Sequence, residues 1–349
     1  MRIAVYGATG FTGGLVVAEL ARRALTPVLI GRDGPRLQAA ARAAGVPDAE
    51  IRIAELGESA ALTAAFTDCA AVVNAAGPFT RWATPVIEAA IAAGAHYVDT
   101  SGEPHYLRTV FDTYGPAAAR AGVAIVPAMA DDGGPGDLIA ALTAAPSGSQ
   151  VDEVLIADLR RPGAVSRGTA RTMAAVLSLE TFEFTQGRWL AVEAAEPAPL
   201  TVPGEPDPVP VGVLTLPGVV TIPRRIPARR VRSVIRAEVA ALFGALTAEV
   251  AESVPATLTD QERQASSWFM YAQATAVDGA RTHGWVTGPD GYGLTAVIAV
   301  EAAVRLAAGD RAGVLSPAQA FDPRDFLDAL TEHGVTWRVE QLAEIRSSR

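Results

Sequence analysis

The sequence predicts an α/β fold in which a doubly wound parallel sheet is joined to a second domain built on a largely antiparallel sheet. Two observations predict this division. Apolar runs and helical patterns alternate through the first 130 residues, and the pattern changes after Pro135-Gly136-Asp137. Regular alternation of strands and helices produces parallel strands that are covered by the connecting helices. A chain of 349 residues is also long enough for two domains of ordinary size.

Six apolar runs in the first part of the chain are expected to be strands, and stretches of helical periodicity separate them. The expected strands cover residues 2–6, 27–31, 50–54, 70–75, 95–99 and 123–127. The expected helices cover residues 13–24, 35–44, 59–66, 83–93 and 104–121. The uninterrupted apolar runs at 70–73 and 123–126 are typical of parallel strands with both faces covered.

Residues 136–290 are expected to form the second, α+β domain. Residues 151–157 alternate as a half-buried strand does, and Asp278-Gly279 lies between two strand-like segments, which predicts a hairpin. Proline and β-branched residues at 197–227 favour edge strands and loops. Helices are expected at 169–179 and 232–251.

Helical periodicity returns at residues 291–308 and again at 323–333. The prediction is therefore that residues 1–135 and 291–349 together form the first domain, with residues 136–290 inserted between them.

A glycine-rich segment follows the first expected strand and opens the first expected helix. Gly7 permits a tight turn, Gly10 lets the backbone approach a pyrophosphate, and Gly13 lets the helix lie close to the strand. The free N–H groups and the positive end of the helix dipole would face the phosphates. This strand–turn–helix context predicts a Rossmann-type dinucleotide site. Its expected residues are Gly7, Ala8, Thr9, Gly10, Phe11, Thr12 and Gly13.

The second expected strand ends at Arg32. A guanidinium at this position meets the 2′-phosphate of NADP through forked, charge-assisted hydrogen bonds. Asp33 lies where an NAD-dependent protein would hold the ribose hydroxyls, but it also precedes Gly34-Pro35 as a helix N-cap does. We therefore expect NADP (NADPH) as the cofactor, with Arg32 as a ligand, and NAD as the weaker alternative.

Small and polar residues follow the later strands, at the edge where ligands bind to open α/β sheets. Small residues let a nicotinamide ribose lie against the backbone, and a proline fixes the turn. Trp82 is interpreted either as a cover for the nicotinamide or as a partly buried core aromatic. The further cofactor-binding candidates are Asn74, Ala75, Ala76, Gly77, Pro78 and Phe79, and then Ser101 and Gly102.

Three acidic residues lie at the same edge. Asp99 is expected to tie its loop down by accepting backbone N–H bonds. Glu103 and Asp132 are the catalytic candidates, as proton donor or substrate anchor. Either of them could instead cap the helix that follows it.

The composition excludes several classes of protein and site. A net charge of −9 argues against a nucleic-acid partner. All 29 Lys and Arg residues are Arg, which excludes Schiff-base chemistry and the Tyr-x-x-x-Lys relay of short-chain dehydrogenases. The single Cys69 excludes an internal disulfide and lies at the entry to a buried strand, where a catalytic thiolate is not expected. The four histidines lack metal-ligand spacing, so no metal is expected.

The sequence also predicts a cytoplasmic protein. The first strand begins at the chain start, leaving no room for a signal peptide, and Cys69 fits a reducing compartment. The most apolar helical stretch is interrupted by Glu301 and Arg305, so no membrane span is expected.

Arginines concentrate between residues 224 and 236. This run is interpreted either as a site for a carboxylate- or phosphopantetheine-bearing substrate or as a solvated face with local ion pairs. The second interpretation is favoured, because most charge runs are of that kind.

Several motifs together resemble the saccharopine dehydrogenase-like family of NADP-dependent reductases, which includes trans-acting enoyl reductases. The resemblance rests mainly on the glycine turn, on residues 74–79 (NAAGPF) and on residues 97–103 (YVDTSGE). Weaker likenesses extend it over nearly the whole length, with a divergent middle at 180–265. That middle departs from the lysine-pathway enzymes and puts saccharopine in doubt as the substrate.

The resemblance implies an NADP-binding Rossmann domain to which the C-terminal helices return, an inserted substrate domain and a homodimer. It also implies hydride transfer to a C=N or activated C=C bond of a small metabolite, which a carrier protein could present. Two alternatives stay open: an NADP-binding scaffold or sensor without turnover, and a redox-neutral isomerase or cyclase that uses a bound cofactor.

Overall fold

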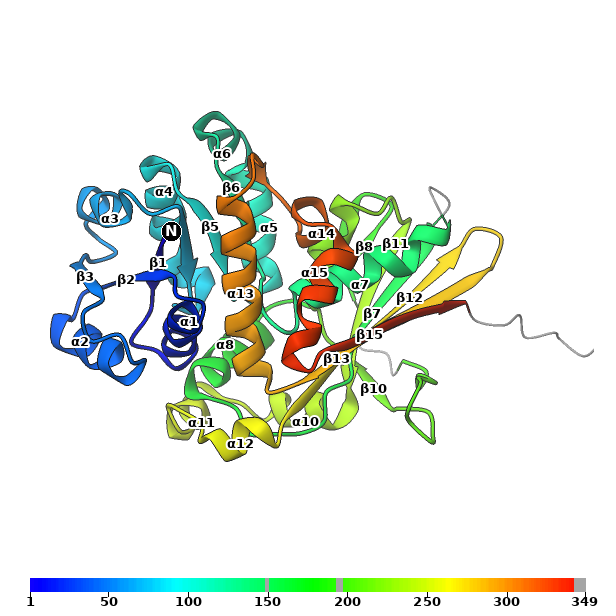
Figure 1. The fold of residues 1–349 in the computed structure, drawn as a ribbon. Coiled ribbons are helices and arrows are strands. Elements are labelled where there is room, and N and C mark those ends of the chain that lie inside the picture. Colours follow the sequence, from blue (N-terminus) through cyan, green and yellow to red (C-terminus); the bar gives the residue numbers. More distant parts are fainter. Residues whose placement is uncertain (148–150, 193–196, 342–349) are drawn as a thin grey trace, which may run out of the picture.

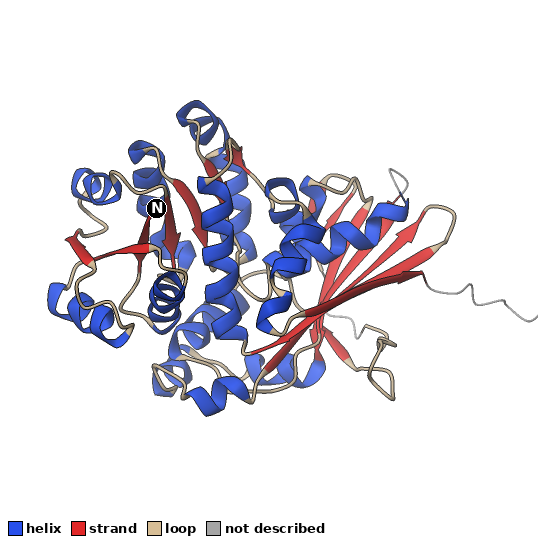
Figure 2. Cartoon of the chain, in the orientation of Figure 1, coloured by secondary structure: helices blue, strands red, loops and turns tan. Residues whose placement is uncertain are grey.

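The computed structural model describes residues 1–147, 151–192 and 197–341 and contains two sheets (Figures 1 and 2). The first sheet is parallel and has the order β14-β6-β5-β4-β1-β2-β3. Its strands are β1 Arg2–Tyr6, β2 Thr26–Gly31, β3 Glu50–Ile53, β4 Ala71–Asn74, β5 His96–Asp99, β6 Ala124–Val126 and β14 Gly313–Val314. The six strands expected in this part of the sequence are thus confirmed.

Helices cover both faces of the first sheet. Successive residues of each strand point to opposite faces, and in this sheet the residues on both faces are apolar. Ile3 and Val5 pack with α1 Phe11–Arg22, α2 Gly34–Ala43 and α13 Gly291–Ala307. Ala4 and Tyr6 belong to a separate cluster on the opposite face. The helices of that cluster are α3 Ser59–Phe66, α4 Phe79–Ala93, α5 Pro104–Thr113 and α6 Gly115–Ala121.

Two helices of this domain differ from the expected boundaries. The single helix expected over 104–121 is divided between α5 and α6 at Gly115-Pro116. Proline has no N–H to donate and obstructs the preceding turn, so it begins a new helix instead of continuing the old one. Helix α4 begins at Phe79, earlier than the expected residue 83.

The second sheet is mixed and mostly antiparallel, with the order β15-β13-β12-β7-β11-β8-β9 and with β10 paired to β11. Only β7 and β11 run parallel. The strands are β7 Val151–Asp158, β8 Phe182–Thr185, β9 Arg188–Ala191, β10 Val211–Val213, β11 Arg230–Arg236, β12 Ser267–Ala276, β13 Arg281–Pro289 and β15 Thr336–Gln341. The predicted fold class is therefore confirmed, and so is the hairpin at Asp278-Gly279.

The helix expected over 232–251 is wrong in its first part, because Arg230–Arg236 forms strand β11. Val231 and Ile235 lie on one face of this strand in the main core, whereas Val234 belongs to the cluster on the other face. Parallel pairing with β7, far away in the sequence, overrides the local pattern. Helices follow only afterwards, as α10 Ala237–Gly244 and α11 Ala248–Ser253.

The remaining helices connect the sheets or cover the second one. Helix α7 Gly134–Ala144 lies on β12 and β13, and the 3₁₀ turns are Ala145–Ser147, Ile222–Arg224 and Thr331–His333. The other helices are α8 Arg167–Leu177, α9 Gly218–Thr221, α12 Asp260–Gln264, α14 Pro317–Ala320 and α15 Pro323–Ala329. Within the described residues, no helix has both the length and the apolar character needed to cross a bilayer.

A single apolar core joins the two sheets. It contains Val5 of the first sheet, Ile156 of the second, Ile298 of α13 and Leu138 of α7. Figure 1 shows α13 standing between the first sheet and the fan of strands of the second. Strand β15 pairs with β13 and thus extends the second sheet, although the helix α13 that precedes it packs on the first. The C-terminal segment therefore contributes to both halves of the molecule.

Candidate functional site

The corner between β1 and α1 depends on close backbone approach. Gly7 has φ +87° and accepts a hydrogen bond from the Gly10 N–H at 2.9 Å. A Cβ on Gly13 would lie 2.1 Å from the Gly7 carbonyl oxygen, so only glycine lets the helix begin here. No side chain caps the start of α1. Its first N–H groups are therefore available to an anion.

The corner lies at the switch point of the first sheet. The strand order reverses between β1 and β4, and ligands of open α/β sheets bind at such a point. The segment after β4 approaches the corner closely, since a Cβ on Gly7 would lie 2.9 Å from the Ala76 nitrogen. The Gly77–Pro78 peptide bond in this segment is cis.

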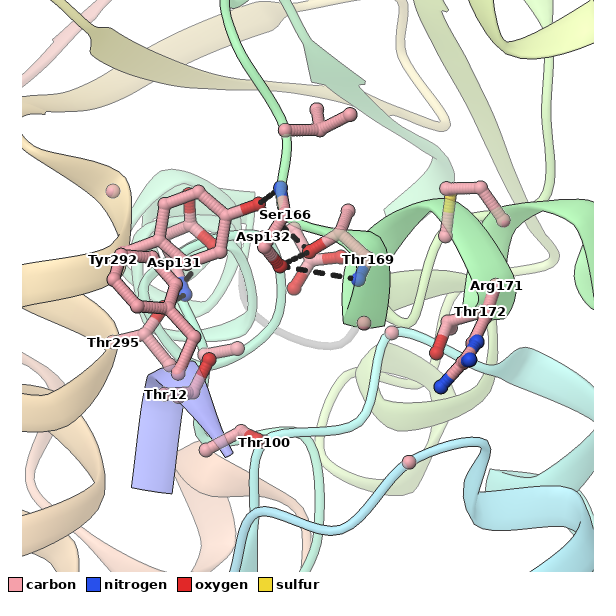
Figure 3. Close-up of a pocket in the computed structure, with 18 of the residues that line it drawn as sticks. Thr12, Thr100, Asp131, Asp132, Ser166, Thr169, Arg171, Thr172, Tyr292 and Thr295 are labelled. Carbon is pink, nitrogen blue, oxygen red and sulfur yellow. Dashed lines mark hydrogen bonds between the residues drawn. The ribbon is translucent and has the colours of Figure 1, made fainter. Parts of the chain in front are cut away.

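A cavity of about 760 Å³ opens from this corner toward the second sheet. Figure 3 shows Thr12 and Thr100 on one side of it and Thr172 of α8 across from them. Of the residues predicted from the sequence, the lining includes Gly7, Thr9, Gly10, Phe11, Thr12, Ala75, Ala76, Gly77, Trp82, Gly102 and Asp132.

Other predicted residues support the cavity without lining it. The Asn74 side chain is buried, donates to the Tyr97 hydroxyl at 3.0 Å and accepts from the Ala76 N–H at 3.0 Å. Four further predicted residues are buried in the glycine turn and in the segment after β4 and do not line the cavity: Ala8, Gly13, Pro78 and Phe79. The Ser101 hydroxyl is buried and accepts from the Glu103 N–H at 3.1 Å.

Asp99 ties its loop down, as the sequence predicted. Its carboxylate accepts from the N–H groups of Ser101 at 3.0 Å and Ala128 at 2.9 Å, and from the Tyr106 hydroxyl at 2.5 Å. Burial nevertheless raises the pKa of Asp99 to about 6. This group holds the ends of β5 and β6 together.

Glu103 is buried and faces the start of α4 instead of the cavity. Its two carboxylate oxygens accept from the N–H groups of Phe79 at 2.6 Å and Thr80 at 2.8 Å, and the Thr80 hydroxyl is a third donor. It therefore caps a helix that precedes it in the sequence. We correct the expectation of a proton donor at Glu103, because its acceptor sites are occupied by structural hydrogen bonds.

Two exposed arginines, Arg32 and Arg36, lie after strand β2 and at the start of α2. Arg32 follows β2 at the surface. Burial raises the pKa of the nearby Tyr6 hydroxyl, and the positive charge of Arg32 partly opposes this rise. Arg36, which the sequence did not single out, lines the cavity. Asp33 accepts the Arg36 N–H at 3.0 Å, which makes it the N-cap of α2. That helical role fits the preference for NADP over NAD.

A cluster of three aspartates and one arginine, Asp131, Asp132, Asp158 and Arg160, also lines the cavity. Arg160 donates to Asp158 at 2.6 Å and to Asp131 at 3.2 Å. Burial, together with the charge of Asp131, raises the pKa of Asp132 to about 7. The Asp132 carboxylate packs against Gly102, where a Cβ would lie 2.6 Å from its Oδ2. Asp132 is therefore the predicted catalytic residue that faces the cavity.

Tyr292, at the start of α13, connects the glycine corner to the second domain. Its ring lies 5.1 Å from that of Phe11, centroid to centroid. Its hydroxyl accepts from the Ser166 N–H at 2.8 Å and lies 2.8 Å from the Thr169 hydroxyl (Figure 3). Sequence reasoning missed Tyr292 and Arg160, since neither belongs to a motif near the glycine turn.

The arginine run on and before β11 is a face with local ion pairs, as favoured from the sequence. Arg230 pairs with Glu183 at 2.7 Å, Arg232 with Glu153 at 3.0 Å and Arg236 with Glu205 at 2.6 Å. Arg229 pairs with Asp152, and Arg224 lies over the Phe111 ring.

Residues 3–126 match the family model described as the saccharopine dehydrogenase NADP binding domain. This part of the chain is therefore similar to the NADP-binding domain of saccharopine dehydrogenases. The resemblance predicted from the sequence is thereby confirmed for it. The saccharopine dehydrogenase (L-Glu forming) of Saccharomyces cerevisiae has the same fold, with a TM-score of 0.63 and 15% identity over 98% of this chain and 100% of that chain.

Curated relatives match part of the chain at higher identity. A Mycobacterium tuberculosis protein that is provisionally named a trans-acting enoyl reductase is 37% identical over 140 residues, which is 39% of this chain and 33% of the relative. The trans-acting enoyl reductase of Mycobacterium ulcerans is 35% identical over 140 residues, 39% of this chain and 34% of the relative. The chain thus spans about a third of the length of the curated relatives that it matches.

The capping role of Glu103 can be tested by its removal. We expect Glu103→Ala to lower the free energy of unfolding by about 2–3 kcal/mol, because it leaves the buried Phe79 N–H and the part-buried Thr80 N–H without an acceptor. Urea unfolding followed by circular dichroism measures the change. Glu88→Ala, on the same helix that Glu103 caps, is the control and should change stability little. Wild-type stability of Glu103→Ala would contradict the assignment.

Proposed function

We propose that the chain is an NADPH-dependent reductase that transfers a hydride to a C=N or activated C=C bond of a small molecule. One observation carries the proposal: the glycine corner and Asp132 line the same cavity. A reductase must place its cofactor and its proton donor beside the same substrate bond. The glycine corner would hold the cofactor in this cavity, and Asp132 would donate the proton there.

The chain's residues fit NADPH. The cradle at Gly7 and Gly13, which a Cβ would fill, and the uncapped start of α1 suit the pyrophosphate. Arg32 and Arg36 would hold the 2′-phosphate, and Ala75, Ala76, Gly77, Ser101 and Gly102 would hold the nicotinamide ribose directly or support it. When bound, the cofactor supplies the hydride.

The protein's own chemical contribution is a proton and an oriented acceptor. A carboxyl group whose pKa is raised to about 7 keeps a proton near neutral pH, as a general acid must. Asp132 would release that proton to the acceptor atom beside the carbon that is reduced. Arg160 forms ion pairs with both Asp158 and Asp131, whereas Asp132 has no such partner among the described residues.

We propose that residues 1–135 plus 291–349 and residues 136–290 form the two domains, with strand β15 of the last segment extending the sheet of the second domain. We also retain the homodimer that the family resemblance implies. A free small molecule is the substrate favoured here over a carrier-bound one, because Arg230, Arg232 and Arg236, which could otherwise meet a phosphopantetheine, are engaged in ion pairs. Light scattering of the purified chain tests the dimer.

The ratio of NADPH oxidised to product formed distinguishes the proposed reductase from its alternatives. NADPH oxidation in step with product formation supports the reductase. Product without NADPH oxidation points to an isomerase or cyclase, and NADPH binding without any turnover across imines and enones points to a scaffold or sensor.

Arg32→Ala and Arg36→Ala test the 2′-phosphate site. Each should raise the Kd for NADPH by roughly 10–100-fold, the value of a hydrogen bond to a charged group, and leave the Kd for NADH nearly unchanged. Isothermal titration calorimetry measures both constants. The control is Arg42→Ala, which removes an exposed arginine from the same helix α2. Equal losses for NADPH and NADH would count against a phosphate role.

Asp132→Asn tests the proton donor. We expect kcat to fall by roughly 10²–10⁴-fold with little change in the Kd for NADPH. In the unaltered protein kcat should decline as pH rises through about 7, because the protonated acid is the active form, and the variant should lose this dependence. Asp48→Asn, in an exposed loop, is the control. A variant that keeps both the wild-type rate and the wild-type pH profile would exclude Asp132.

A further inference from the structure

The cavity has a second, apolar end that the cofactor and the charged cluster do not use. Helix α8 contributes Met173 and Val176 to it, helix α10 contributes Val239, Leu242 and Phe243, and the segment before α9 contributes Leu214. We call these six residues the apolar compartment. None of them carries a charge or a hydrogen-bond donor in its side chain, whereas the rest of the lining includes Asp131, Asp132 and Arg160.

The apolar compartment adjoins the expected hydride-transfer point. A Cβ built on Gly77, in the segment expected to hold the nicotinamide ribose, would lie 3.2 Å from the Thr172 hydroxyl on α8. Met173 is the next residue of that helix, and Val176 follows one turn later. A molecule whose reactive carbon lies near Gly77 and Asp132 therefore has its remaining atoms directed either into the apolar compartment or out to solvent.

Apolar side chains also gather at the surface beside the compartment. Leu242 lines the cavity and is 54% exposed, and Leu177, Leu179 and Val250 are further exposed apolar residues on or next to α8 and α11. Helix α8 contacts both α10 and α11. Contiguous exposed apolar surface beside a cavity is typical of a site that receives an apolar ligand.

We propose that the apolar compartment binds a hydrocarbon chain of the substrate, so that the molecule reduced in this cavity is amphipathic, with its reactive polar end at Asp132. This inference rests on the proposed function for the identity of the reaction, but not for the binding of the chain. Each methylene transferred from water into such a compartment tightens binding by about fourfold, until the compartment is full.

Binding of the chain can be measured without turnover. The probe is N-phenyl-1-naphthylamine, whose fluorescence rises in apolar surroundings, and the competitors are 1-butanol, 1-hexanol, 1-octanol and 1-decanol in the presence of NADPH. We expect each pair of added methylenes to lower the competing concentration by roughly tenfold or more. A competition that does not depend on chain length would overturn the proposal.

Two matched variants assign the effect to the compartment. Leu242→Glu puts a charge at its wall on an exposed position that folding tolerates, and Leu190→Glu makes the same change at a 44% exposed leucine on β9, which does not line the cavity. Leu242→Glu should weaken competition by 1-decanol at least tenfold while leaving that by 1-butanol and the Kd for NADPH unchanged. Equal behaviour of the two variants would place the chain elsewhere and refute the inference.

A turnover series separates this inference from the proposed function. NADPH oxidation with trans-2-hexenal, trans-2-octenal and trans-2-decenal should show a KM that falls with chain length at similar kcat. Chain-dependent competition without oxidation of any alkenal or imine supports the compartment and removes the reductase. Oxidation with a KM that is flat across the series, together with flat competition, supports the reductase and removes the compartment.

Discussion

The contact between Gly7 and Gly13 is the constraint on which the rest of the site depends. With only 2.1 Å between the Gly7 carbonyl oxygen and the place of a Cβ on Gly13, no other residue lets α1 begin this close to β1. Because α1 begins so close to β1, its free N–H groups face the end of β1, and Phe11 at its start lines the cavity. A helix displaced by the width of a methyl group would move these N–H groups and Phe11 away from the cavity.

The same corner is connected to the second sheet through one aromatic residue. Phe11 contacts the Tyr292 ring, and the Tyr292 hydroxyl holds the start of α8 through Ser166 and Thr169. Tyr292 is itself fixed, since Asp290 caps α13 by accepting the Gly293 N–H at 2.9 Å. The position of α8, and with it the wall of the apolar compartment, therefore depends on the same helix that packs against α1.

Most of the first domain could be predicted from the sequence because its determinants are local. Alternating apolar runs define strands, and the glycine spacing defines the corner whatever the rest of the chain does. The predictions that failed depend on partners far away in the sequence. Strand β11 exists because β7 pairs with it. The role of Glu103 was misjudged because its partner, the start of α4, lies 24 residues earlier, and Ser166 lies 126 residues from Tyr292.

The surroundings of Glu103 and Asp132 explain why Asp132 is the carboxyl group suited to hold a proton. Glu103 is the more deeply buried, and three structural hydrogen-bond donors occupy its carboxylate. Arg160 forms ion pairs with Asp131 and Asp158. Among the described residues Asp132 takes part in no ion pair, and the neighbouring Asp131 charge adds to the cost of its ionisation. An apolar ligand in the adjoining compartment would exclude water from this group and raise that cost further, so that filling the cavity would itself favour the protonated acid that a reduction requires.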